Sequence, residues 1–208
     1  MILTQHGIDS LKRSKIVGYV TIGGRDYPYV KIGRQFWIAE NLDYKWSGLT
    51  VGANNSSAGY PRANYYNNNE ATYGFNGNKY GLLYNFPAAK YLGDNPQLLP
   101  DGWHIPSVDE FDELISNSGS TPQESCYNLK SKTGWNSNGI DLYGFSIVPA
   151  GNYWGDFGNL GVIGFFWTKT VYDSTYSYRV TASASISTGQ GGLFTNNNEY
   201  SLRLVKNM

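Results

Sequence analysis

The stretch "SVDEFDELISNSG" (residues 107–119) contains the clearest helix signal in the 208-residue chain. Ser107 and Glu110 have the spacing of a capping box, in which each side chain accepts a hydrogen bond from the other residue's backbone N–H. Apolar side chains then recur at helical spacing, at Val108, Phe111, Leu114 and Ile115. The sequence therefore predicts an amphipathic helix that begins after Ser107 and ends near Gly119, a typical C-terminal stop.

Two further helix signals flank this one. Before it, "YGLLYNFPAAKYLG" (residues 80–93) has partly helical spacing, with Pro87 either in the first turn or at a kink. After it, "STPQE" (residues 120–124) places Thr121 at the cap, Pro122 in the first turn and Glu124 in a second capping box. We expect two or three helices in all.

Short strand-like runs occupy both ends of the chain. Residues 19–42, "YVTIGGRDYPYVKIGRQFWIAENL", predict a β-meander with turns at the glycines. Residues 47–77 are polar and rich in turn residues, which predicts a long surface excursion. Four later runs predict short strands: "YGFSIVPAG" (143–151), "GFFWTKT" (164–170), "YSYRVTASASI" (176–186) and "YSLRLVK" (200–206). Helices combined with short, mainly antiparallel strands and long loops indicate an α+β domain.

Composition limits the kinds of partner. Lys and Arg total 16, as do Asp and Glu, so no basic field is available for nucleic acid or an anionic membrane. No apolar run is long enough to insert into a membrane, and no secretory signal peptide is recognisable at the start. The single cysteine, Cys126, excludes an intrachain disulfide, and we expect it to be a small buried residue. We predict no metal and no cofactor.

The domain boundaries follow from the same patterns. Residues 1–18 form a mixed leader, either an attachment segment or a first strand, and residues 19–208 form one domain. The 18 Tyr, 9 Phe and 6 Trp residues occur with 25 Gly. This composition is typical of a folded chain with an aromatic core and tight turns.

Seven blocks of sequence occur in order along the chain: "VKIGRQFWIAENLDY" (30–44), "YYNNN" with "KYGLLYNFPAA" (65–89), "LPDGWHIPSVDEFDEL" (99–114), "LKSKTGWN" (129–136), "DLYGFSIVPAG" (141–151), "GFFWTKT" (164–170) and "YSLRLVK" (200–206). Together they resemble the major paralogous domain family first named from Fibrobacter succinogenes, which is abundant in gut Bacteroidetes and their phages. The resemblance covers roughly residues 18–206.

The resemblance implies a C-type lectin-like fold, of the kind shared with formylglycine-generating enzymes and with variable proteins diversified by retroelements. It implies a non-enzymatic ligand-binding module that displays its C-terminal segment on a stable scaffold. The copper chemistry of the formylglycine-generating relatives needs two thiols, and this chain has only Cys126.

The resemblance also bears on location. Family members often carry cysteines where this chain has Tyr65, Leu99 and Leu204. Together with the missing signal peptide, this favours a virion protein of a phage tail, assembled in the bacterial cytoplasm, over the alternative of a bacterial cell-surface protein. The opening "MILTQHGIDSL" is similar to the start of tail- and fibre-associated phage proteins, which suggests attachment to a tail structure through the N-terminus.

The candidate binding surface lies in residues 152–180, "NYWGDFGNLGVIGFFWTKTVYDSTYSYRV", and in the later "SASISTGQGGLFTNNNEY" (residues 183–200). Retroelement-diversified relatives vary this part of the domain. We expect Phe145, Phe165 and Trp167 to be core residues. Aromatic side chains among Gly, Ser and Asn resemble the contact surfaces of antibodies. The predicted ligand-binding residues are Asn152, Tyr153, Trp154, Asp156, Phe157, Asn159, Phe166, Lys169, Tyr172, Asp173, Tyr176, Tyr178, Asn196 and Asn198.

The expected partner is a protein or glycan on the surface of the host cell. Two alternatives stay open: a carbohydrate-active enzyme that uses Asp141, Asp156 or His104, and a structural virion or fimbrial subunit, for example a homotrimer. For His104, which precedes the capped helix, a structural hydrogen bond is the favoured role. The asparagine runs at residues 65–69 and 195–199 are poor calcium loops because they lack clustered carboxylates.

Overall fold

An antiparallel meander opens the fold, as the sequence predicts. The computed structural model describes residues 15–52, 59–77, 79–173, 176–193 and 198–208. Strands β1 (Ile16–Ile22), β2 (Arg25–Ile32) and β3 (Gln35–Ile38) pair in sequence order, and β13 (Val205–Asn207) pairs with β3 on the other side. Because β1 begins at Ile16, the sheet includes the last residues of the segment assigned to the leader; residues 1–14 lie outside the described part of the chain.

The predicted helix after Ser107 is α4 (Val108–Ser116), and both bonds of its capping box are present. The Ser107 hydroxyl accepts from the Glu110 backbone N–H at 3.1 Å, and the Glu110 carboxylate accepts from the Ser107 N–H at 2.7 Å. The helix ends at Ser116, three residues before Gly119, because Asn117 caps it instead.

The two flanking helices are also present, with different boundaries or caps. Helix α3 (Phe86–Asp94) has its proline in the first turn, while part of the segment before it forms strand β6 (Leu83–Asn85). In α5 (Pro122–Leu129) the Thr121 hydroxyl accepts from Glu124 N–H at 3.2 Å, but the Glu124 carboxylate accepts from Ser120 N–H at 2.8 Å. The second capping box therefore differs from the predicted one, because the Glu124 carboxylate accepts from the residue before the N-cap.

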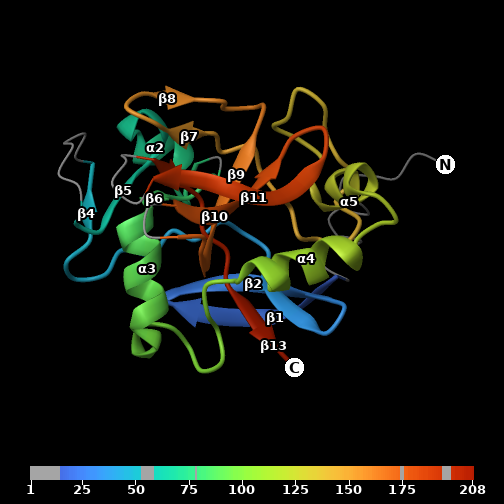
Figure 1. Cartoon of the computed structure of the whole chain (residues 1–208), viewed down its shortest axis with the longest axis horizontal. Helices are drawn as coiled ribbons and strands as arrows, with labels where there is room; N and C mark the ends of the chain where they lie inside the picture. The colour runs from blue at the N-terminus through green and yellow to red at the C-terminus, as the bar shows by residue number, and fades with distance from the viewer. Residues whose placement is uncertain (1–14, 53–58, 78, 174–175, 194–197) are drawn as a thin grey trace.

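The remaining strands form two sheets (Figure 1). One is three-stranded, in the order β11 (Ile186–Leu193), β10 (Tyr176–Ala182) and β9 (Gly164–Val171). The other follows the order β4 (Thr50–Val51), β5 (Arg62–Asn64), β6, β12 (Glu199–Tyr200), β7 (Asn152–Tyr153) and β8 (Phe157–Gly158). Of the strand pairs described, only β4 with β5 is parallel. The α+β class with mainly antiparallel strands is confirmed.

Most described residues of the segment 47–77 are exposed or half-buried, as expected for a surface excursion, but part of the segment also contributes to the fold. It contains β4, β5, a 3-10 turn η1 (Tyr66–Asn68) and α2 (Glu70–Tyr73), and residues 62–65 are buried. Polar side chains can be buried here because Arg62 and Asn64 donate to the buried Glu199 carboxylate. A second 3-10 turn, η2 (Pro96–Leu98), follows α3.

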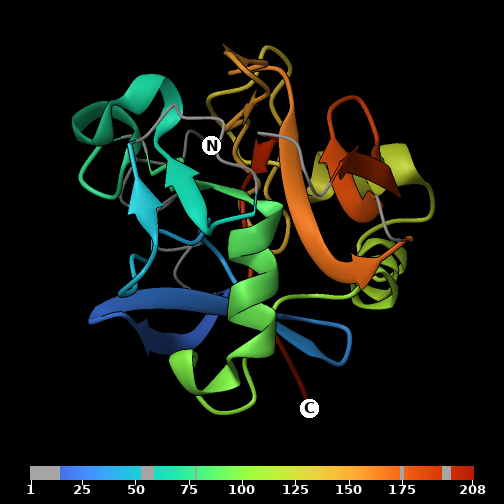
Figure 2. The same cartoon turned by 60° about the vertical axis from the view of Figure 1, so that its left-hand side comes forward.

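Strand β9 separates two apolar clusters. Phe165 and Trp167 pack into the first cluster, where Trp167 meets Phe86 of α3 at 5.3 Å between ring centroids. Phe166 packs into the second, against Phe111 of α4. Figure 2 shows α3 beside the long β9 strand. Alternate side chains of a strand point to opposite faces, so β9 contributes side chains to both apolar clusters.

Core residues expected from the sequence are confirmed at Phe145, Phe165 and Trp167, and Cys126 is a free, fully buried thiol. The strand expected at residues 143–151 is wrong: this segment makes single bridges, Lys130 with Ile147 and Gly151 with Gly164. No helix among the described residues has the length and apolar character needed to cross a membrane.

Candidate functional site

Some of the predicted binding residues are buried, which corrects their assignment to a displayed surface. Tyr153 pairs with Glu199 across β7 and β12 and packs on Phe157 with ring centroids 4.9 Å apart. Phe166 points toward α4, as described above. The exposed fractions are 7% for Asn152, 5% for Tyr153, 1% for Phe166 and 6% for Asn198. Asn196 lies outside the described residues.

One exposed group lies on the β7–β8 hairpin, along the top of Figure 1. Trp154 is 71% exposed, and Asp156 and Asn159 are also exposed. Phe157 is half-buried because it packs on Tyr66, whose ring centroid is 5.2 Å away. This hairpin therefore presents one large aromatic side chain to solvent.

A second exposed group occupies the far end of the β9–β10 hairpin. We define the hairpin tip by its described residues: Lys169, Val171, Tyr172, Asp173, Tyr176 and Tyr178. Val171 is 49% exposed, Tyr172 46% and Tyr176 38%. The ring centroids of Tyr172 and Tyr178, the latter half-buried, lie 5.4 Å apart in an edge-to-face contact. The tip thus gathers apolar and aromatic surface at one place.

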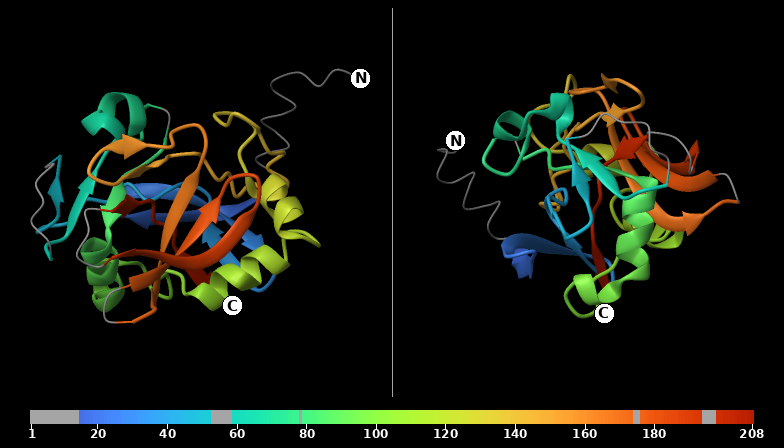
Figure 3. Two further views of the ribbon diagram at one scale, coloured as in Figure 1. Left: turned by 45° about the horizontal axis from the view of Figure 1, so that its top comes forward. Right: turned by 90° about the vertical axis from the view of Figure 1, so that its left-hand side faces the viewer.

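The two exposed groups do not form one surface. Gly151, beside β7, bridges to Gly164 at the start of β9, whereas the hairpin tip begins where β9 ends. At about 3.3 Å per residue, β9 sets these two ends roughly 23 Å apart. Figure 3 shows the end of the β9–β10 hairpin at the edge of the molecule, away from the β7–β8 hairpin.

Backbone and side-chain hydrogen bonds fix the hairpin tip to the frame. The Lys169 N–H donates to the Pro106 carbonyl at 2.7 Å, and the Thr170 hydroxyl accepts from the Val108 N–H at 3.0 Å, at the start of α4. The Lys169 ammonium lies 3.7 Å from the Glu110 carboxylate. The capped helix and the tip are therefore coupled through the first turn of α4.

Glu110 is the centre of this coupling. Its carboxylate meets His104 Nε2 at 2.6 Å and accepts from Asn207 Nδ2 at 2.7 Å. Burial opposes ionisation of Glu110, but the hydrogen bonds from His104, Ser107 N–H and Asn207 outweigh it and lower the pKa to about 2. The structural hydrogen bond expected for His104 is confirmed.

The other two residues considered for an enzymatic role have their own hydrogen bonds. Asp141 is buried, and its carboxylate accepts from the Ser146 N–H at 2.8 Å and from the Ser146 hydroxyl at 2.6 Å. Asp156 accepts from the Phe157 N–H at 2.8 Å in the β7–β8 turn. None of the hydrogen bonds or ion pairs found in the described part of the chain joins Asp141, Asp156 and His104 to one another.

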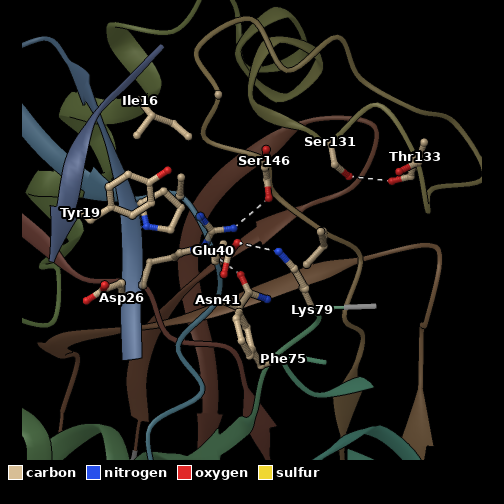
Figure 4. Close-up of a pocket in the computed structure, with 15 residues that line it drawn as sticks. Ile16, Tyr19, Asp26, Glu40, Asn41, Phe75, Lys79, Ser131, Thr133 and Ser146 are labelled. Carbon is tan, nitrogen blue, oxygen red and sulfur yellow. Dashed lines mark hydrogen bonds and ion pairs between the residues drawn. The ribbon is translucent and has the colours of Figure 1, made fainter. Parts of the chain in front are cut away.

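A cleft of about 610 Å³ lies between the N-terminal strands and the segment 131–148 (Figure 4). Ile16 and Tyr19 come from β1, Asp26 and Pro28 from β2, and Ala39, Glu40 and Asn41 follow β3. Phe75 and Lys79 close a third side, and the remaining lining residues are Ser131, Thr133, Gly144, Ser146, Val148 and Arg203. None of the predicted binding residues lines this cleft.

The side chains at the floor of the cleft are held by ion pairs and hydrogen bonds. Glu40 pairs with Arg25 and, at 3.4 Å, with Lys79. Arg203 is fully buried and donates to Asn41 Oδ1 at 2.8 Å and to the Ile38, Phe145 and Ser146 carbonyls at 2.8–2.9 Å. Burial lowers the pKa of Arg203 to about 9, so its guanidinium is charged at neutral pH.

Sequence reasoning missed the cleft because its residues come from distant parts of the chain. Tyr19 and Glu40 belong to the N-terminal meander, Phe75 to the segment predicted as a surface excursion, and Arg203 to the C-terminal run. Lys79 lies just after that excursion. One available signal was Arg203, a charged residue between leucines in an apolar strand pattern. A charge at such a position needs buried partners.

Comparisons with known proteins give a family and nothing finer. A family model described as the Fibrobacter succinogenes major domain matches residues 30–206. Neither the curated proteins nor the solved structures contain a match to the chain. In the part of the chain that the structure describes, no group of three or more His, Cys, Asp or Glu side chains is arranged to hold a metal ion. Because the family model spans most of the 208 residues, the chain belongs to the Fibrobacter succinogenes major domain family.

Proposed function

We propose that this chain is a non-enzymatic receptor-binding protein that contacts a protein or glycan on a host-cell surface through the hairpin tip. The observation that carries the proposal is the exposed cluster of Val171, Tyr172 and Tyr176 at the end of an otherwise buried strand. Exposed apolar clusters of this kind commonly mark interaction sites in soluble proteins.

Hydrogen bonds between its two strands order the described part of the tip. The N–H groups of Tyr172 and Asp173 donate to the Tyr176 carbonyl at 2.9 and 3.1 Å, and the Tyr176 N–H donates to the Asp173 carboxylate at 2.8 Å. Ordering a loop on binding costs free energy, so a tip already ordered by its own hydrogen bonds favours affinity. Tyrosine adds contact area and a hydroxyl at low entropic cost.

The charged residues at the tip are of both signs, so the tip has no strong electrostatic field of one sign. Within the tip, Lys169 is exposed and pairs with Glu110, and Asp173 carries the opposite charge. A partner surface with mixed polarity suits this arrangement better than a polyanion.

The proposal also covers the scaffold that carries the tip and the location of the protein. We infer a C-type lectin-like scaffold from the resemblance of the sequence, supported by the α+β arrangement in which β13 closes onto β3 beside the N-terminal hairpin. We further propose that the chain is a phage tail protein or a retroelement-diversified variable protein, attached through its N-terminal segment; support for this rests on the sequence resemblance alone.

The test is binding of labelled protein to a panel of gut Bacteroidetes strains, measured by flow cytometry. We expect Tyr172→Ala/Tyr176→Ala to weaken binding to any recognised strain by about tenfold or more, because truncation of central interface tyrosines costs more than about 1 kcal/mol each. Thermal unfolding should remain near that of the wild type, since both side chains are exposed.

The matched control is Tyr60→Ala/Trp154→Ala, which removes two aromatic side chains that are 72% and 71% exposed but lie outside the tip. This control should bind as the wild type does. Wild-type binding by the tip variant, or equal losses in both double variants, would contradict the proposal.

A further inference from the structure

The cleft of Figure 4 is a second candidate site, distinct from the hairpin tip. Its volume of about 610 Å³ falls within the range of about 300–1,000 Å³ that is typical of small-ligand sites. None of the tip residues lines it. Its ligand chemistry can be inferred from the charges, the hydrogen-bonding groups and the exposed rings around it.

Charged groups of both signs line the cleft and the network beneath it. Glu40 is held between Arg25 and Lys79, Asp26 accepts from the Thr21 hydroxyl at 2.5 Å, and Arg203 lies on the floor. An anionic ligand would meet the carboxylates of Asp26 and Glu40, and a cationic ligand would meet Lys79 and Arg203. The balance therefore favours a neutral ligand.

The hydrogen-bonding side chains of the cleft include both acceptors and donors, which suits a ligand that can both donate and accept. A carboxylate such as Glu40 accepts only, and ammonium or guanidinium groups such as Lys79 donate only. Arg203 is fully buried and donates to four protein oxygens in the described residues, so it contributes its charge to the floor of the cleft and no free donor. Adjacent hydroxyl groups of a sugar can donate to an acceptor and accept from a donor at the same time.

Two aromatic rings supply the apolar part of the site. Tyr19 is 65% exposed and Phe75 is 41% exposed, and Figure 4 shows Tyr19 at the left of the cleft and Phe75 at the bottom. The Arg25 guanidinium stacks on Phe75 at 3.6 Å from the ring centroid, which holds this ring in place. Exposed rings at a polar cleft can pack against the C–H groups of a sugar ring.

We propose that this cleft binds a short, neutral oligosaccharide, which stacks on Tyr19 and Phe75 while its hydroxyl groups bond to Glu40 and Lys79. The site is independent of the hairpin tip, so a glycan bound here need not be the receptor contacted by Tyr172 and Tyr176. The proposal concerns binding and includes no chemical step.

The experiment uses the whole chain on a glycan array that carries neutral and acidic oligosaccharides, followed by calorimetric titration with the neutral oligosaccharide that binds best. We expect Tyr19→Ala/Phe75→Ala to weaken this affinity by about tenfold, because the ligand loses the packing of both rings. Glu40→Gln, which keeps the side-chain shape but weakens the acceptor, should also weaken it.

Two variants separate this site from the hairpin tip and from loss of folding. Tyr172→Ala/Tyr176→Ala should bind the array glycan as the wild type does. Tyr19→Ala alone removes a mostly exposed side chain, so it tests the cleft even if loss of Phe75 disturbs the Arg25 network. The proposal is overturned if no neutral glycan binds, if acidic glycans are preferred, or if affinity is lost in the tip variant but kept in the cleft variants.

Discussion

At the scale of single residues, the fold depends on buried charges that are tied to several segments. Glu199 has no exposed surface, and its carboxylate accepts from Arg62 Nε at 2.7 Å and from Asn64 Nδ2 at 2.9 Å. These contacts join β12 to β5. Such a buried carboxylate is costly to ionise, even with a cation beside it.

Glu199 should make stability depend on pH near neutrality. Burial raises the pKa of Glu199 to about 7, above the 4.5 of a free glutamate, although Arg62 opposes this shift. A raised pKa means that the folded state holds its proton more tightly, so the contribution is fully present below about pH 4.5 and is lost as the pH rises through about 7. The free energy of unfolding should therefore decrease between pH 5 and pH 7.5 by on the order of 1–3 kcal/mol.

Urea unfolding of Glu199→Gln at several pH values checks this prediction, because a side chain that does not titrate should flatten the slope. The matched control is Glu70→Gln, an exposed position whose hydrogen bond from Lys45 lowers its pKa and so places its effect at more acidic pH. Equal slopes in wild type and Glu199→Gln would show that another group is responsible.

At the scale of elements, the cap of helix α4 links a local sequence signal to a tertiary contact. Helix α4 has a complete capping box, and in its first turn the Val108 N–H also donates to the hydroxyl of Thr170, next to the hairpin tip. The cap therefore stabilises both the helix and the surface that we propose for binding.

Ser107→Ala should lower the free energy of unfolding by about 1 kcal/mol, because the Glu110 N–H loses its side-chain acceptor. The control is Ser116→Ala in the last turn of the same helix, where the exposed hydroxyl donates to the Glu113 carbonyl. Chemical denaturation of both variants measures the difference. If Ser107→Ala is no less stable than Ser116→Ala, the cap does not contribute as we infer.

At the scale of the whole molecule, the first and last strands of the described chain belong to one sheet, in the order β1, β2, β3 and β13. Val205 lies opposite Trp37 of β3, and it exchanges backbone hydrogen bonds of 2.9 and 3.0 Å with His104 before α4. Just before β13, Arg203 donates to carbonyls at Ile38 and at residues 145–146. The C-terminal strand thus holds the N-terminal meander, the start of α4 and the floor of the cleft together.

Removal of residues 205–208 should therefore lower the melting temperature by roughly 10 °C or more, since several kcal/mol of strand pairing and buried Val205 are lost. Removal of Met208 alone is the control, because its side chain is 64% exposed. Differential scanning calorimetry compares the two truncations. A truncated chain that melts with the wild type would show that β13 is dispensable.

The sequence by itself determined the features that depend on neighbouring residues. The capping box at Ser107, the turns of residues 19–42 and the aromatic core positions Phe165 and Trp167 follow from spacing and residue type, and the structure confirms them. Seven ordered blocks were enough to indicate the family, which the family model confirms.

Only the tertiary structure decided which residues of the aromatic stretch reach solvent and which distant residues share a cleft. Tyr153 and Trp154 are neighbours of similar chemistry, yet one is 5% and the other 71% exposed, because strand pairing with β12 buries only Tyr153. Tyr19, Phe75 and Arg203 line one cleft although they are far apart in the chain. Exposure and proximity depend on long-range pairing of strands, and local sequence patterns do not encode that pairing.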